Sequence, residues 1–175
     1  MRHTREEVRT AYHEAGHALI ALHFIHLSAL GIESKVKYGG RSFTRLKGWI
    51  HFSRGSKVSV EENILIELAG PAAEKMCPFG PGRDFYHASM LDMENVEKAL
   101  KGIVTDSERG EYLDECRARV EGILKHHWPE VKALAKALLE RKRLTGAQAE
   151  KIASEVWEKE KGRHPKTGCG KKKGE

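Results

Sequence analysis

The sequence predicts a single domain that is mainly α-helical (α+β), with a small β-hairpin or short sheet. Apolar residues recur every three or four positions over most of the chain, and capping patterns of the form Ser/Thr-x-x-Glu/Gln precede several of these stretches. Only two short segments are rich in β-branched and aromatic residues. A chain of 175 residues with 39% hydrophobic content can form one core but is short for two domains.

The first predicted element is a helix over residues 5–27. Thr4 and Glu7 have the spacing of a capping box, and the apolar residues that follow keep a helical period. Two short strands are expected next, over 32–38 and 48–52, because their β-branched and aromatic residues flank a polar connection that contains glycine. We expect them to form a hairpin or two strands of one small sheet.

A second helix is expected after Ser59, which has capping-box spacing to Glu62. Pro71 falls inside the helical pattern and should kink this helix, and the Pro- and Gly-rich stretch 77–82 should end it. Three more stretches have helical periodicity, 89–101, 112–125 and 129–141. A last capping pattern opens a helix over 145–157.

The positive charge of the chain is concentrated at one end. The net charge is +6, and residues 161–175 hold six basic residues and one acidic residue, so residues 1–160 are nearly neutral. We expect 1–160 to form a zinc metallopeptidase-like domain, for the reasons given below, and 161–175 to be a basic, disordered tail. Nucleic acid is not the expected partner, although a basic tail could also act as a nucleic-acid-binding arm.

The cysteines and the apolar segments favour a cytoplasmic protein without a membrane segment. Cys77, Cys116 and Cys169 are odd in number and form no C-x-x-C pair, so neither a disulfide framework nor a thiolate zinc site is indicated. The apolar run 18–27 contains two histidines and is too short to span a bilayer. We therefore expect a reducing, cytoplasmic location.

The segment His13-Glu14-Ala15-Gly16-His17 matches the metal-binding motif H-E-x-x-H. On a helix, two histidines four residues apart differ by roughly 40° around the axis and about 6 Å along it, so both imidazoles can bind one zinc ion. Glu14 is offset by about 100° from His13, which places its carboxylate beside the ion, where it can take a proton from a zinc-activated water. The motif predicts His13 and His17 as zinc ligands and Glu14 as the catalytic base.

A catalytic zinc needs a third protein ligand, and Asp92 is the first candidate. Four apolar residues follow it at helical spacing, Val96, Ala99, Leu100 and Ile103. Asp92 is therefore expected to face inward, as a ligand or as a capping carboxylate of its own helix, and Asp84 and His87 are the alternative ligands. We exclude His23, which on an unbroken helix points roughly 240° away from His17 and should be an ordinary, partly buried histidine.

Several stretches resemble the zinc peptidase domain of the FtsH-type membrane proteases, and the likeness extends over residues 8–152. Residues 11–18 look like the metal helix of that family, 48–50 like its cleft strand, 67–74 like its central helix, 88–92 like the segment that supplies its aspartate ligand, and 138–146 like its C-terminal helix pair. The chain differs by one extra residue between the serine and the aspartate, and by Pro71 where a basic residue is usual.

The resemblance implies a mostly helical fold, zinc held by His13, His17 and Asp92, and Glu14 as the base. We expect a zinc metalloendopeptidase that hydrolyses flexible or unfolded polypeptides. Because the sequence has no G-x-x-x-x-G-K-[ST] phosphate loop, such chains are either already flexible or delivered by a separate ATPase in trans. The alternative is a catalytically silent zinc-containing module that binds peptides or a partner ATPase. No oligomeric state is predicted.

Two further hypotheses concern the surroundings of this site. The strand that contains Trp49 and Phe52 could receive a substrate as an added strand, or these two side chains could only fill the core. Glu74 could accept a hydrogen bond from a metal-bound imidazole, or it could be an ordinary solvated acid near the end of its helix.

Overall fold

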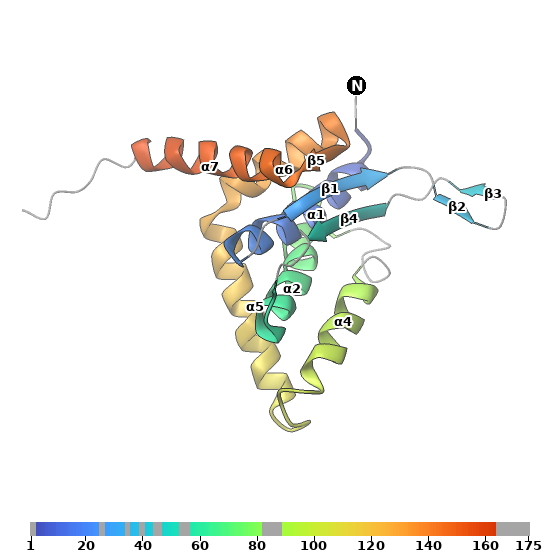
Figure 1. Ribbon diagram of the computed structural model, residues 1–175, viewed down its shortest axis with the longest axis vertical. Coiled ribbons are helices and arrows are strands. Elements are labelled where there is room, and N and C mark those ends of the chain that lie inside the picture. Colours follow the sequence, from blue (N-terminus) through green and yellow to red (C-terminus); the bar gives the residue numbers. More distant parts are fainter. Residues whose placement is uncertain are drawn as a thin grey trace, which may run out of the picture.

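The computed structural model describes residues 3–24, 27–33, 36–38, 41–43, 47–52, 57–81 and 89–163. The helices are α1 (Arg5–Phe24), α2 (Val60–Met76), α4 (Met90–Leu100), α5 (Arg109–His126), α6 (Trp128–Arg141) and α7 (Gly146–Arg163). The strands are β1 (Leu27–Glu33), β2 (Val36–Tyr38), β3 (Arg41–Phe43), β4 (Lys47–Phe52) and β5 (Arg143–Thr145). The predicted mainly helical α+β class is confirmed (Figure 1).

β1 is the central strand of a three-stranded antiparallel sheet with the order β4-β1-β5. Leu30 pairs with Ile50 of β4 and with Leu144 of β5, which joins two segments far apart in the sequence. β2 and β3 form a separate antiparallel hairpin that extends away from the helices (Figure 1). The sheet that the two predicted strands should form is thus present, and its other edge is a strand that the sequence did not predict.

Two boundaries around β1 differ from the prediction. The first helix ends at Phe24 and not at residue 27, and the strand begins at Leu27 and not at residue 32. The apolar run 27–32 fits either a helix or a strand, and pairing with β4 and β5 on its two sides decides for the strand.

The metal-motif helix α1 packs against α2, and the two helices come close together at Gly16. A Cβ atom at this position would overlap Cβ of Ala73 and the carbonyl oxygen of Ala69. Around this contact lies a buried apolar core that includes Ile20 and Ile64. The close crossing places residues 13–17 directly against the middle of α2.

The capping predictions are confirmed in all three cases. The side-chain oxygen of each capping residue accepts a hydrogen bond from the backbone N–H of the residue three positions later. The side-chain oxygen of that later residue accepts a hydrogen bond from the backbone N–H of the capping residue. The pairs are Thr4 with Glu7, Ser59 with Glu62, and Thr145 with Gln148. α2 ends at Met76, directly before the predicted breaker, and it contains Pro71. The kink at Pro71 stays a prediction.

The C-terminal helices follow the predicted order with shifted ends. Pro129 lies in the first turn of α6, where its missing N–H costs nothing, and Lys142 ends this helix in the left-handed conformation with φ 63°. α7 continues to Arg163, three residues beyond the predicted domain boundary. The rest of the predicted tail, with Cys169, lies outside the described residues.

The predicted apolar stripe of α4 is correct for Val96 and Leu100, which are fully buried. It is wrong for Ile103, whose side chain is 43% exposed, because α4 ends at Leu100 and the chain turns away from the core there.

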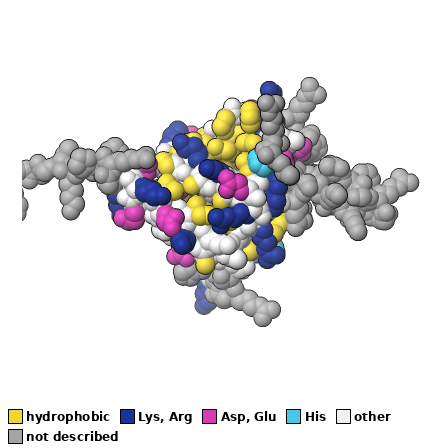
Figure 2. Space-filling view, turned by 90° about the horizontal axis from the view of Figure 1, so that it is seen from above, with side chains coloured by type: hydrophobic (Ala, Val, Ile, Leu, Met, Phe, Trp, Pro, Cys, Tyr) yellow, Lys and Arg dark blue, Asp and Glu magenta, His cyan; other side chains and the backbone are white. Residues whose placement is uncertain are grey.

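Charges of both signs are mixed on the surface. On the face seen from above in Figure 2, Lys and Arg side chains lie among acidic and apolar ones and do not form one basic patch. Among the described helices, none is long and apolar enough to cross a membrane.

Candidate metal centre

Three side chains from two helices converge on one point between α1 and α4. His13 Nε2 lies 3.0 Å from His17 Nε2 and 3.1 Å from Asp92 Oδ2, and the third edge, from His17 Nε2 to Asp92 Oδ2, is 3.8 Å. A tetrahedral zinc ion with bonds of about 2.0–2.1 Å holds its ligand atoms about 3.3 Å apart. The triangle therefore has the size that a zinc site requires, and these are the three residues for which the sequence suggests this role.

The Asp92 carboxylate supports a cation more directly. Its Oδ2 atom is buried and has no hydrogen-bond partner, although His13 Nε2 is 3.1 Å away, so the angles between these two groups do not suit a hydrogen bond. A buried carboxylate oxygen without a partner is costly, and a cation inside the triangle would compensate it. Two imidazoles and a carboxylate are a donor set that zinc accepts. The chain's residues therefore fit the ion that its motif implies.

The outer nitrogens of the two histidines are held in place. His13 Nδ1 lies 3.2 Å from Glu74 Oε2, and His17 Nδ1 lies 2.6 Å from the carbonyl oxygen of Ile66. Because a carboxylate and a carbonyl oxygen only accept, both Nδ1 atoms must donate, which leaves both Nε2 lone pairs for a metal. Glu74 is only 5% exposed, so it is not a solvated acid.

Two glycines make room for this arrangement. A Cβ atom at Gly70 of α2 would overlap the Nε2 atoms of His17 and His13, and a Cβ atom at Gly48 of β4 would overlap the carboxylate of Glu14. α2 therefore lies directly against the Nε2 atoms of both imidazoles, and β4 runs directly past the predicted base. Spacing arguments do not detect either requirement, because only the packed helices and strand create it.

Two acids near the triangle, Glu14 and Glu67, have raised pKa values in the metal-free site. Burial raises the pKa of Glu14 to about 7; the charge of His13 opposes this shift, and Asp92 and Glu67 add to it. Burial also raises the pKa of Glu67 to about 7, against a hydrogen bond from Asn95 at 3.3 Å. The sequence did not indicate that Glu67 lies near the site.

The two histidines respond in opposite ways to the same surroundings. Burial opposes the charged form of His13, but the nearby carboxylates of Asp92 and Glu74 outweigh it and raise the pKa to about 10. Burial and the neighbouring charge of His13 lower the pKa of His17 to about 4. The carboxylates thus attract one positive charge into the metal-free pocket, which is consistent with a site built for a cation.

The other predicted site residues do not join the triangle. Asp84 and His87 lie outside the described residues. His23 does not belong to the triangle; it is exposed and not, as was predicted, partly buried, and its ring lies beside His127. The capping alternative for Asp92 is not supported, because Ser89 makes no side-chain capping bond and the Asp92 carboxylate reaches the histidines.

Trp49 lies on the outer face of the sheet. Its ring covers Gly31 of β1, lies 5.5 Å from the Arg143 guanidinium and stacks on His51, whereas its neighbour Gly48 faces Glu14. Phe52 is 38% exposed. The hypothesis that these two aromatic side chains fill the core is therefore wrong.

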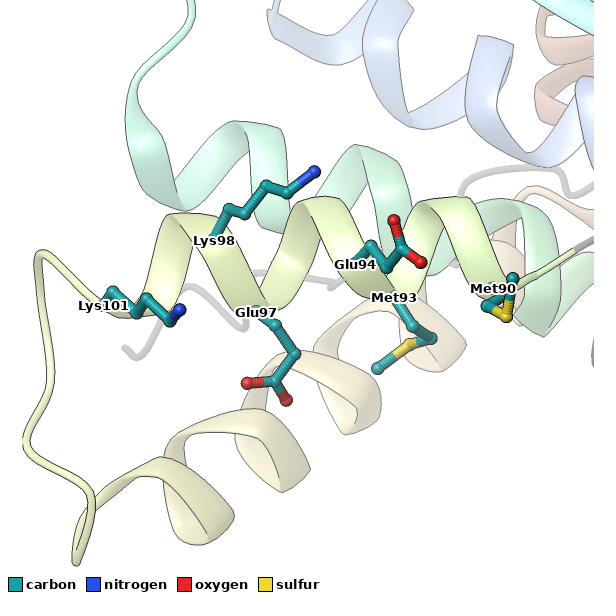
Figure 3. A pocket seen from close by; sticks show the side chains of 6 residues that line it. All are labelled: Met90, Met93, Glu94, Glu97, Lys98 and Lys101. Carbon is teal, nitrogen blue, oxygen red and sulfur yellow. The ribbon is translucent and has the colours of Figure 1, made fainter.

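Two hollows lie on other surfaces. One of about 400 Å³ follows the outer side of α4, where the acidic side chains Glu94 and Glu97 are followed by the basic Lys98 and Lys101 (Figure 3). The other, of about 420 Å³, lies between α2, α4 and α5 and includes Leu68 and Val120. No member of the metal triangle lines either hollow, so neither is part of the candidate site.

One comparison with known proteins gives a distant match. The chain is 28% identical over 177 residues to the "ATP-dependent zinc metalloprotease FTSH 9, chloroplastic/mitochondrial" of Oryza sativa subsp. japonica. The match covers 85% of this chain and 22% of that protein, so the chain spans about a fifth of its length. No protein-family model matches the chain. The similarity indicates a distant relationship to FtsH proteases.

Proposed function

We propose that this chain is a zinc-dependent peptidase domain that hydrolyses peptide bonds in flexible or unfolded polypeptides. The observation that carries the proposal is the buried Glu14 carboxylate next to a triangle of three metal-ligand atoms from His13, His17 and Asp92. Structural zinc sites are closed by four protein ligands, whereas only three converge here among the described residues. A site with an open position and an adjacent carboxylate suits hydrolysis.

The proposed mechanism assigns a separate task to each side chain. A zinc ion held by His13, His17 and Asp92 would supply Lewis-acid polarisation of the scissile carbonyl and of the attacking water. Glu14 accepts a proton from that water and passes it to the nitrogen of the leaving amine. The elements of water are thereby added across the C–N bond, which yields a carboxylic acid and an amine.

The position of β4 supports binding of the substrate as an added strand. β4 is an edge of the sheet, and its Gly48 touches Glu14, so a chain paired with this edge would run past the base. Such pairing requires an extended backbone with free N–H groups, which a flexible or unfolded polypeptide offers. Peptides N-methylated on either side of the scissile bond should be cleaved poorly, whereas Trp49→Ala should leave cleavage intact.

The test of the proposed function compares Glu14→Gln with the exposed control Glu155→Gln. Wild type and Glu155→Gln should cleave a denatured protein, and Glu14→Gln should not, while zinc analysis finds the metal in all three. Zinc-loaded wild type that leaves unfolded proteins and peptides intact would instead support the silent binding module.

A further inference from the structure

A second pair of histidines lies at the C-terminal end of α1. His23 occupies the last turn of α1, and His127 joins α5 to α6. The centroids of their rings are 5.0 Å apart at 76°, compared with 4.7 Å and 72° for His13 and His17. The two pairs have nearly the same edge-to-face arrangement.

The outer Nδ1 hydrogen bonds of the second pair repeat those of the first. His23 Nδ1 lies 2.9 Å from the carbonyl oxygen of Leu19, and His127 Nδ1 lies 3.1 Å from Glu130 Oε1. Both partners only accept, so both Nδ1 atoms donate and both Nε2 lone pairs are available. In each pair one imidazole is held by a carboxylate and the other by a backbone carbonyl, the usual outer contacts of metal-bound histidine.

One carboxylate oxygen of Glu130 is buried without a hydrogen-bond partner. The residue is 2% exposed, and its second oxygen, Oε2, is buried without a hydrogen-bond partner. A buried carboxylate with one satisfied oxygen favours positive charge on the imidazole that it holds, or a cation bound to that imidazole. This observation is independent of the ring geometry.

We propose that His23 and His127 form a second binding site for a divalent transition-metal ion, zinc in the first instance, through their Nε2 atoms, with water completing the coordination. Imidazole suits zinc, copper and nickel. With zinc–nitrogen bonds of about 2.0–2.1 Å and tetrahedral angles, the centroids of two ligating rings lie about 5 Å apart. The ring centroids of His23 and His127 are 5.0 Å apart, which agrees with this distance.

The second site should bind its ion more weakly than the first. It offers two protein ligands and not three, and His23 is exposed whereas His13 and His17 are buried. Lys161 lies 5.0 Å from the ring of Trp157, which itself packs against His127, and adds a positive charge nearby. An ion at this site would tie the end of α1 to the junction of α5 and α6.

Equilibrium dialysis of the full chain against zinc tests the proposal. Wild type should bind two zinc ions per chain, one of them weakly, and His23→Gln/His127→Gln should bind one. The control His3→Gln/His51→Gln removes two histidines outside both pairs and should still bind two. A single ion in wild type, or two ions in the His23→Gln/His127→Gln variant, overturns the proposal.

A readout on wild-type protein avoids dependence on how the variant folds. Long-range ¹H–¹⁵N correlation spectra report which ring nitrogen of each histidine is protonated and which binds metal. The first equivalent of zinc should shift the Nε2 signals of His13 and His17, and the second those of His23 and His127. If the signals of His23 and His127 stay unchanged at excess zinc, this pair does not bind zinc and the proposal is wrong.

Discussion

The two histidine pairs, His13 with His17 and His23 with His127, share their ring geometry and the pattern of their Nδ1 hydrogen bonds but differ in their surroundings. His13 and His17 are each 6% exposed, and Asp92 closes their triangle from another helix. His23 is exposed and His127 is partly buried, with ring contacts from His126 and Trp157 on His127, and no described carboxylate completes a triangle with them. Oriented imidazoles alone therefore do not distinguish the proposed peptidase centre from the second pair; the third ligand atom, the burial and the neighbouring Glu14 do.

The largest difference between the pairs should follow from Asp92→Asn. The loss of one ligand charge should lower zinc affinity at the His13–His17 site by more than about 100-fold and abolish cleavage. This exceeds the loss of about 10–100-fold that follows when a residue hydrogen-bonded to a metal ligand is replaced. Zinc competition with a chelator and a peptide assay measure both effects. Asp114→Asn, whose side chain is 77% exposed, serves as the control. Wild-type activity in Asp92→Asn would remove Asp92 from the site.

The close approach of Gly70 to the first pair gives the next prediction. Gly70→Ala introduces a Cβ that overlaps His17 and His13 Nε2, so zinc affinity and cleavage should fall together. Gly122→Ala on α5 meets open space and should raise the free energy of unfolding by up to about 1 kcal/mol through helix propensity, without a change in zinc binding. Metal titration and urea unfolding separate these outcomes. Equal zinc affinity in the two variants would contradict the close approach of α2.

Glu74 and Glu130, whose carboxylates each contact one histidine of a pair, should each affect zinc binding only at their own pair. Glu74→Gln should weaken zinc at the His13–His17 site by about 10–100-fold, and Glu130→Gln should do the same only at the His23–His127 site. Stepwise zinc titration followed by the histidine ring signals measures each site. Full zinc affinity in Glu74→Gln would mean that its contact with His13 Nδ1 does not orient this ligand.

The smallest effect concerns the first turn of α1, outside both pairs. Glu7 accepts from the Thr4 backbone N–H and from Lys142, and these contacts lower its pKa. Because the folded pKa lies below the unfolded one, the stabilisation is present above the ordinary value of 4.5 and is lost as pH falls through the folded pKa. Glu7→Gln should therefore lower the free energy of unfolding at neutral pH by under about 1 kcal/mol, and not in acid. Urea unfolding at both pH values, with Glu6→Gln as the control, tests the sign.

Helices and their caps could be predicted because their information is local. The capping boxes at Thr4, Ser59 and Thr145 form as their spacing indicates. β5 could not be predicted, because its three residues become a strand only by pairing with β1, more than a hundred positions earlier in the chain. The start of β1 was wrong for the same reason, since partners distant in the sequence decide between helix and strand.

The candidate site divides in a similar way. The motif histidines and Glu14 follow from spacing on one helix, and helical periodicity turns Asp92 inward. The role of Glu74 depends on the crossing of α1 and α2 at Gly16, which spacing does not describe. The contact of His127 with His23 needs α6 to pack on α1, so the second pair was visible only in the fold.

Anomalous diffraction at the zinc absorption edge, on crystals of the zinc-loaded protein, tests the central claim most directly. The strongest anomalous peak should lie between His13 Nε2, His17 Nε2 and Asp92 Oδ2, next to the Glu14 carboxylate. A map without a peak in this triangle, or with the zinc bound by His13 and His17 while Asp92 points elsewhere, would contradict the proposed metal centre.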